Sequence, residues 1–226
     1  MAMNARNLLL IVGAAVVVAI AGIYYYISLP DPSTTSFAES ASAPTSGDDI
    51  LVAGPLGEQS LGDPSAPVTV IEYASMTCSH CATFHEETFT PFKEKYVDTG
   101  KVHFIFREYP LDALASSAFV LARCLPEERY FAFVDLLFHQ QAVWAFSQNP
   151  AIELLRIGKQ AGFTQESFKA CLTNQKILDG VNWVKNRGSE EFGVRSTPTF
   201  FINGRKPSKN GALSLDDLSQ EIDPLL

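Results

Sequence analysis

Two cysteines separated by only two residues, Cys78 and Cys81, have the residue types and spacing to do chemistry. The run from Val68 to Tyr73 before them is apolar and rich in β-branched residues, which indicates a buried strand. Apolar residues recur after the cysteines at spacings of three to five, which is typical of one helix face. We therefore expect Cys78 at the N-terminus of a helix and Cys81 one turn inside it.

The expected helix start gives Cys78 a specific chemical property. The free N–H groups and the dipole at a helix N-terminus favour an anion, so they lower the pKa of a thiol placed there. Cys81 would lie within reach of Cys78 but turn toward the interior. An exposed attacking thiol beside a buried partner is the arrangement for reversible disulfide exchange. The sequence therefore predicts a redox-active disulfide, Cys78–Cys81, that works without a separate cofactor.

A metal site is the alternative interpretation of this pair. A lone Cys-x-x-Cys can be half of a zinc site, and together with His80 it would suit a carrier of copper or zinc. Further ligands would be needed, and the chain has no second Cys-x-x-Cys and no paired histidine motif. The setting between a strand and a helix favours the redox interpretation, so we expect no metal.

The N-terminus predicts an exported protein. Residues 8–29 are apolar and uncharged, and they are long enough to span a bilayer, for which about 20 residues are needed. Arg6 precedes this run and Asp31 follows it, which places the N-terminus inside and the rest outside. A cleaved signal peptide is the alternative. The three tyrosines at residues 24–26 favour a retained anchor, residues 1–29.

Composition divides the rest of the chain into two parts. Residues 30–49 are rich in Ser, Thr, Ala and Pro, which predicts a flexible linker. Residues 50–226 are long enough for one domain with a sizeable core. The formal net charge is −8 and basic residues do not cluster, so nucleic acid is not an expected partner.

The other two of the four cysteines are Cys124 and Cys171. An even number of cysteines in an exported chain is compatible with two disulfides. If Cys78 pairs with Cys81, then Cys124 and Cys171 are left for each other; the alternative is two unrelated buried thiols. Their bridge would close a long loop and add about 4 kcal/mol to stability in the chain-entropy model.

The order of predicted elements indicates an α/β fold. Three strands and a candidate edge strand are expected at residues 68–74, 101–108, 199–202 and 50–52. Only helical patterns lie between the second and third strands, at residues 113–124, 127–140, 151–162, 165–174 and 176–188. This order predicts an α/β layer with a helical insertion at about residues 112–188.

Local signals add detail to this prediction. Pro91 lies within the pattern of the cysteine helix and should kink or break it. Asn203 and Gly204 follow the last strand and predict a hairpin turn. Ser214 is a good N-cap for a last helix at residues 215–222.

These features resemble the thioredoxin superfamily and, more narrowly, the DsbA-like periplasmic thiol:disulfide oxidoreductases. The resemblance covers about residues 50–226. It rests on Cys78-Ser-His-Cys81 at a strand-to-helix turn, on Glu72 six residues earlier, and on Thr197-Pro198 before a strand. It implies a thioredoxin fold with an inserted helical subdomain, and the hydropathy pattern places a transmembrane helix before it.

The resemblance implies a role for each matched residue. Cys78 corresponds to the nucleophile that forms a mixed disulfide with substrate, and Cys81 to the resolving thiol. His80 belongs to the dipeptide that tunes the thiolate. Glu72 corresponds to an acidic residue under the site that moves a proton to or from the buried cysteine.

Three further residues correspond to positions that meet the substrate: Ser79, Thr197 and Pro198. The pair Thr197-Pro198 matches a cis-proline loop that faces the cysteines and receives substrate backbone. Ser79 stands where the best-known oxidase has Pro, and Thr197 stands where it has Val. The pair Cys124–Cys171 resembles an extra disulfide of one DsbA-like subgroup.

The resemblance also implies partners and a location. Unfolded or reduced exported proteins would be the substrates, and a quinone-linked membrane protein of the DsbB type would reoxidise the enzyme. The domain would lie on the periplasmic side of the inner membrane, anchored by residues 8–29 or soluble after cleavage.

An isomerase or reductase kept reduced is the alternative within the family, because Thr before the proline also occurs in isomerases. Dedicated isomerases carry an N-terminal dimerisation domain, for which residues 30–66 are too short and too polar.

Other polar and aromatic residues are expected outside the chemistry. Three histidines should be structural or on the surface: His85, His103 and His139. Two tryptophans should lie in the core: Trp144 and Trp183. Two arginines should form salt bridges: Arg107 and Arg195.

Overall fold

The structure is a computed structural model that describes residues 49–226 of the chain. The predicted anchor at residues 8–29 and nearly all of the predicted linker lie outside the described residues. Within residues 49–226, no helix combines the length and the apolar character that a membrane span requires.

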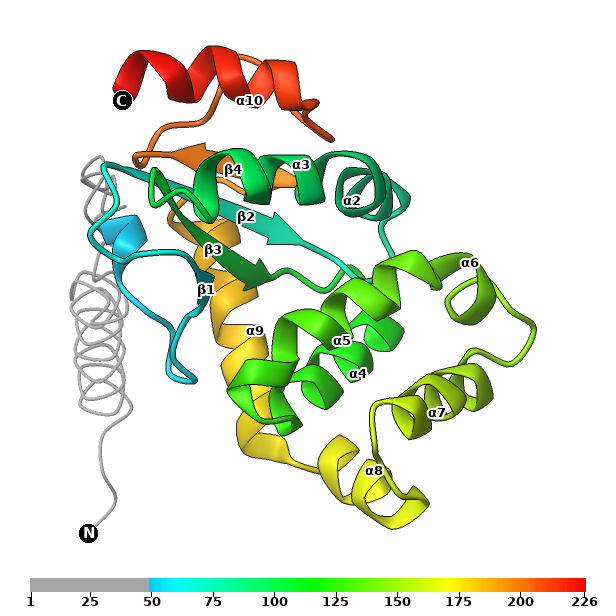
Figure 1. Ribbon diagram of the computed structural model, residues 1–226. Helices are drawn as coiled ribbons and strands as arrows, with labels where there is room; N and C mark the ends of the chain where they lie inside the picture. The colour runs from blue at the N-terminus through cyan, green and yellow to red at the C-terminus, as the bar shows by residue number, and fades with distance from the viewer. Residues whose placement is uncertain (1–48) are drawn as a thin grey trace, which may run out of the picture. The chain divides into compact units, whose positions relative to one another are not determined.

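A four-stranded sheet with the order β1-β3-β2-β4 lies at the centre of the described domain (Figure 1). The strands are β1 (Gln59–Leu61), β2 (Val68–Ala74), β3 (Val102–Glu108) and β4 (Thr199–Ile202). β2 runs parallel to β3, and the two edge strands pair antiparallel with their neighbours. The three main predicted strands are confirmed, two of them with the predicted limits and β3 one residue shorter.

The edge strand expected at residues 50–52 was wrong. Asp49–Leu51 forms a short 3₁₀ helix, η1, which buries Ile50 and leaves Leu51 exposed. The edge of the sheet is instead β1, residues 59–61. An apolar run of three residues does not show a period, so the sequence pattern does not distinguish a helical turn from a strand here.

The cysteine helix follows β2 and continues to residue 97 with changing hydrogen-bond patterns. Its parts are α2 (Ser79–Thr83), η2 (Phe84–Phe89), α3 (Thr90–Phe92) and η3 (Lys93–Val97). The flanking segments η2 and η3 are π-helical, and the backbone at Thr90 stays helical, with φ −60° and ψ −54°. Pro91 therefore does not break the helix, because wider turns on either side accommodate its missing N–H.

The helical insertion follows β3 and contains every helix predicted for it. Its members are α4 (Ala113–Cys124), α5 (Glu127–His139), α6 (Gln141–Trp144), α7 (Pro150–Gln160), α8 (Gln165–Leu172) and α9 (Gln175–Glu190). Only α6 was not predicted, because four residues are too few to show a helical period. The final helix α10 (Leu215–Ile222) begins after its predicted N-cap, Ser214.

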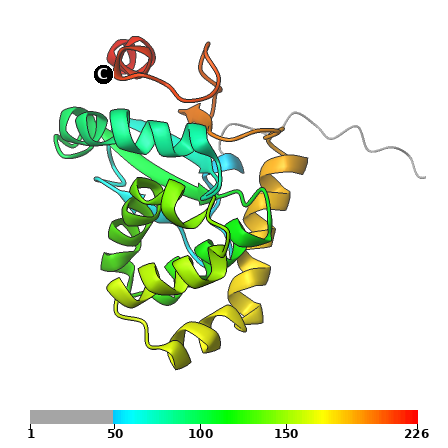
Figure 2. The same ribbon diagram turned by 90° about the vertical axis from the view of Figure 1, so that its right-hand side faces the viewer.

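The alternation of side chains along β2 divides the core between the two faces of the sheet. Ile71 and Tyr73 belong to one buried cluster together with Val184 of α9, whereas Val70 belongs to another cluster that includes Phe84 of the cysteine helix. Figures 1 and 2 show α9 on one face of the sheet and the α2–α3 helix on the other. Because both faces are covered, β2 is buried along nearly its whole length.

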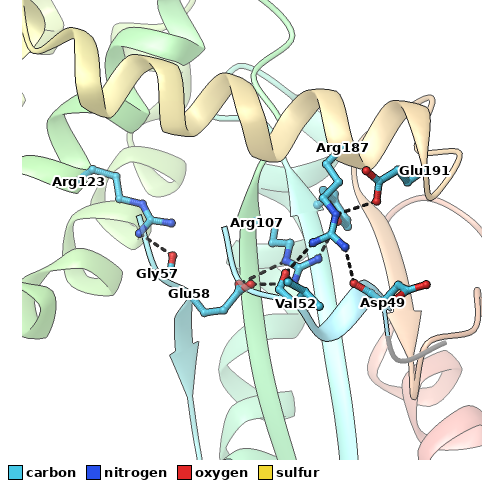
Figure 3. A network of polar contacts seen from close by, with 9 residues as sticks. Asp49, Val52, Gly57, Glu58, Arg107, Arg123, Arg187 and Glu191 are labelled. Atoms are coloured by element: carbon cyan, nitrogen blue, oxygen red, sulfur yellow. Dashed lines mark hydrogen bonds and ion pairs between the residues drawn. The ribbon is translucent and has the colours of Figure 1, made fainter. Parts of the chain in front are cut away.

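Arginine side chains from the insertion hold the segment that leads into β1 (Figure 3). Arg187 of α9 donates to the carbonyl oxygens of Asp49 at 2.7 Å and Val52 at 2.9 Å. Arg123 of α4 donates to the carbonyl of Gly57 at 3.1 Å. The backbone carbonyls of this irregular segment are thus paired with charged donors.

The structure confirms the predicted environment of Arg107 and Trp144 but corrects that of Arg195 and Trp183. Arg107 forms the predicted salt bridge, with Glu58 at 2.7 Å. Arg195 instead donates to the carbonyl of Ser189 at 2.8 Å and makes no ion pair with any described residue. Trp144 is fully buried, whereas Trp183 is 41% exposed and lies under the guanidinium of Arg187 rather than in the core.

Candidate active site

Cys78 lies at the N-cap of α2, at the point where the chain leaves β2 and turns into the helix. Its backbone is extended, with φ −85° and ψ 116°, and its N–H donates to the carbonyl of Ser75 at 3.1 Å. The residues of the first helical turn are Ser79 and His80, both exposed, and Cys81, which is fully buried. The strand–turn–helix geometry therefore matches the sequence prediction.

The surroundings of Cys78 make its thiol acidic. The pKa of Cys78 is lowered to about 5, first by a hydrogen bond from the Cys81 thiol and then by the Thr197 hydroxyl and the backbone N–H groups of Cys81 and His80. Partial burial opposes this shift but does not outweigh it. At neutral pH, Cys78 is therefore a thiolate in the reduced protein.

Cys81 has the opposite character. Burial raises the pKa of the Cys81 thiol well above its usual value, and the hydrogen bond to Cys78 and the charge of Glu72 raise it further. Both cysteines are free thiols in this structure, so the site is in its reduced form. The pair consists of one acidic thiol and one thiol that holds its proton.

Cys78 is more covered than the sequence suggested. We expected a solvent-facing thiol, but the residue is only 8% exposed. The cover comes partly from the loop before β4, because the carbonyl oxygen of Thr197 lies 3.2 Å from the Cys78 Sγ. Little of the Cys78 side chain is therefore open to solvent in this structure.

Pairing between β2 and β4 brings the Thr197-Pro198 loop to the cysteines. Tyr73 near the end of β2 lies opposite Thr199 at the start of β4, so the residues after one strand and before the other meet. The peptide bond between Thr197 and Pro198 is cis. Two segments that are 119 residues apart in sequence thus form one site.

Glu72 and His85 form a buried polar pair that the sequence analysis did not identify. Glu72 Oε2 lies 3.0 Å from His85 Nε2, and their side chains are 0% and 1% exposed. His85 also stacks on Phe138, with ring centroids 4.3 Å apart. His85 is therefore not on the surface but next to a predicted site residue.

The position of His85 in the sequence carried a signal that we did not use. His85 follows Cys81 by four residues, so the two side chains lie on the same face of the helix. In the described part of the chain, the outer atoms of the pair, Glu72 Oε1 and His85 Nδ1, are buried without a hydrogen-bond partner. Polar atoms of this kind are rare in protein interiors.

The second pair of cysteines lies in the helical insertion. Cys124 at the end of α4 and Cys171 of α8 form a disulfide, as predicted, with Cα atoms 6.1 Å apart. Across residues 49–226, no cluster of three or more His, Cys, Asp or Glu side chains has a geometry suited to a metal ion.

Comparison with known proteins gives a family for this arrangement. A family model described as thioredoxin matches residues 56–224. The chain belongs to the thioredoxin family. Its α/β fold with a helical insertion is the thioredoxin fold predicted from the sequence, with the DsbA-like elaboration of its structural neighbours.

Solved and curated relatives agree with this family. The chain is 35% identical to alpha-DsbA1 of Wolbachia pipientis, with a TM-score of 0.71 over 79% of this chain and 95% of that one. It is 33% identical over 167 residues to a Rickettsia typhi protein named as a protein-disulfide oxidoreductase, which covers 74% of this chain and 61% of the relative. A Rickettsia felis protein with the same name is 35% identical over 171 residues, or 74% of this chain and 59% of the relative. The chain thus spans about three fifths of the length of these curated relatives.

Proposed function

We propose that this protein is a thiol:disulfide oxidoreductase that introduces disulfides into exported proteins through Cys78 and Cys81. The observation that carries the proposal is the contrast within the pair: an acidic thiol at a helix start beside a buried thiol that keeps its proton. The names of the relatives support the same activity.

The exchange proceeds in two displacements. In the oxidised protein, a substrate thiolate attacks the Cys78 sulfur, the Cys78–Cys81 bond breaks, and Cys81 leaves and takes up a proton. A second substrate thiolate then attacks the substrate sulfur of the mixed disulfide, and Cys78 leaves as a thiolate. Two substrate thiols are oxidised to a disulfide, and the protein's disulfide is reduced to two thiols.

The acidity of Cys78 sets the direction of this reaction. A stabilised thiolate is a good leaving group and lowers the free energy of the reduced protein, which makes the Cys78–Cys81 disulfide a strong oxidant. His80 is exposed on the first turn, and its charge, when protonated, favours the thiolate.

Neighbouring residues supply the remaining roles in the proposal. Glu72, buried below Cys81, exchanges the proton that Cys81 takes up and gives back. Ser79 and the backbone of Thr197 and Pro198 surround Cys78 and meet the extended substrate chain.

The cycle requires reoxidation and a location outside the cytoplasm. We assign reoxidation to a quinone-linked membrane protein of the DsbB type, and the substrates to unfolded or reduced exported proteins. The apolar run at residues 8–29 supports a position on the periplasmic side of the inner membrane, either anchored there or soluble after cleavage.

The proposal is tested by oxidation of a reduced dithiol peptide with the purified oxidised protein. We expect stoichiometric disulfide formation and loss of all turnover in Cys78→Ser. A protein that oxidises nothing but reduces insulin disulfides would instead be the reductase alternative. Reduced protein that retains zinc or copper through Cys78 and Cys81, and does not exchange disulfides, would be the metal carrier.

A further inference from the structure

Gln141 of α6 is a buried polar residue in the helical insertion. It has no assigned role in the exchange reaction described above. Its side chain is 4% exposed. Its Nε2 donates two hydrogen bonds, to the carbonyl of Met76 at 2.9 Å and to the carbonyl of Cys78 at 3.0 Å. A buried side-chain amide that donates both of its N–H hydrogens to carbonyl groups of one short turn holds the backbone of that turn in place.

The two carbonyls belong to the turn that presents the nucleophile. The carbonyl of Cys78 also accepts the first bond of α2, from the N–H of Ala82 at 3.1 Å. The orientation of this carbonyl sets the direction of the following peptide units, whose N–H groups at His80 and Cys81 stabilise the Cys78 sulfur. Gln141 therefore acts on the helix start rather than on the sulfur itself.

The position of α6 makes Gln141 a fixed support. Trp144, on the same short helix, is fully buried, and its indole N–H donates to the carbonyl of Leu137 at 2.8 Å. In Figure 1, α6 lies at the end of α5 that is nearest the start of α2. The amide is thus held by the core of the insertion while it reaches the turn that follows β2.

A second contact links the insertion to the same turn. The hydroxyl of Thr77 donates to Asp112 Oδ2 at 2.6 Å, and Asp112 Oδ1 caps α4 by accepting from the N–H of Ala115 at 2.8 Å. The insertion therefore contacts three successive residues of the turn, Met76, Thr77 and Cys78. Thr77 is partly exposed, whereas both Gln141 bonds are buried, so Gln141 is the better-defined support.

We propose that Gln141 is a positioning residue for thiol exchange: by holding the carbonyls of Met76 and Cys78, it keeps the first N–H groups of α2 aimed at the nucleophilic sulfur. The inserted helices thereby control the reactivity of a cysteine that they do not contain. This inference rests on the proposed exchange at Cys78. It adds Gln141 to the residues that set the reactivity of that cysteine.

The test compares Gln141→Met with Gln140→Ala. Methionine keeps the length of the side chain but has no donor, so the Met76 and Cys78 carbonyls lose their partner. Gln140 is the neighbouring glutamine, and its side chain makes no capping hydrogen bond at the start of α6. The readout is the pH dependence of Cys78 alkylation in the reduced protein, together with the equilibrium against glutathione.

In Gln141→Met we expect the alkylation midpoint to rise by about one pH unit and the equilibrium to move about tenfold toward the disulfide form. In Gln140→Ala neither should change. The nearby titratable groups Cys81, His80, Glu72 and Asp112 are the same in both proteins. A Gln141→Met protein that is folded by circular dichroism and titrates like the wild type would overturn the inference.

A second variant covers the case in which Gln141→Met does not fold. Gln141→Asn keeps the amide but is one methylene too short to reach both carbonyls, and it should shift the midpoint in the same direction. No shift in that variant would also overturn the inference. A wild-type midpoint near pH 8.5 would instead contradict the proposed function itself, so the two failures are distinguishable.

Discussion

At the scale of single residues, two thiols of the same type acquire opposite properties from their surroundings. Donors around Cys78 hold its pKa down to about 5, and burial holds that of Cys81 up. The spacing of the cysteines predicted this contrast, because a helix start and a position one turn inside follow from sequence. The sequence did not indicate that His85 pairs with Glu72, because the packing of the helix on the sheet determines this contact.

The acidity of Cys78 makes the stability of the reduced protein depend on pH. The folded pKa, about 5, lies far below that of a thiol in the unfolded chain, so the stabilisation is fully present above about pH 9 and is lost as pH falls through about 5. In the folded protein, Cys81 keeps its proton throughout this pH range. Below about pH 8 it therefore does not counteract the loss of stability that accompanies falling pH. Urea unfolding of reduced wild type and Cys78→Ser should show the wild-type advantage shrinking between pH 9 and pH 5. Parallel stability curves would contradict the assigned acidity.

The buried pair Glu72–His85 leads to a prediction about stability. His85→Phe fits among the surrounding aromatic rings but leaves the Glu72 carboxylate buried without its partner. We expect a loss of about 3 kcal/mol in the free energy of unfolding, measured in urea at pH 7. His139→Phe, at a position that is 47% exposed, is the control and should change stability little. Equal values for the two variants would show that the pair is not needed for the fold.

At the scale of elements, long patterns were predictable and short ones were not. The strands at residues 68–74 and 199–202 and the helix at 113–124 have the predicted limits. The Asn203-Gly204 turn also forms, with φ of 45° and 77° at its two residues. The segments η1 and α6 were missed because three or four residues carry no period, and tertiary contacts decide their conformation.

The packing of α9 on β2 depends on Gly188. A Cβ at this position would lie 2.8 Å from Cε1 of Tyr73, whose ring is fixed by Arg107 and its aromatic neighbours. Gly188→Ala should therefore lower stability by about 1–3 kcal/mol, although alanine is the better helix former by about 1 kcal/mol. Asn186→Ala, on the exposed side of the same helix, should be neutral or slightly stabilising in thermal unfolding. Stabilisation by Gly188→Ala would contradict this account of the packing.

At the scale of the whole described domain, the helical insertion supports both the sheet and the site. Arg123 and Arg187 bind the segment before β1, and Gln141 binds the turn before α2. The sequence predicted the insertion as a block of helices. It did not predict these contacts, because they join residues that are far apart along the chain.

The Cys124–Cys171 disulfide should stabilise the insertion without taking part in exchange. A double variant, Cys124→Ser with Cys171→Ser, should lose up to about 4 kcal/mol of stability, because the bridge no longer restricts the unfolded chain. Peptide oxidation by Cys78 and Cys81 should persist at temperatures where the variant is folded. Loss of exchange in a folded double variant would show that this bridge belongs to the catalytic cycle.

Cys78 is proposed to be an acidic nucleophile whose disulfide with Cys81 oxidises other thiols. The most direct test is the pH dependence of Cys78 alkylation in the reduced protein, combined with the glutathione equilibrium of the pair. We expect a midpoint near pH 5 and a disulfide that glutathione reduces readily. A midpoint near pH 8.5, with a pair that glutathione leaves oxidised, would contradict it.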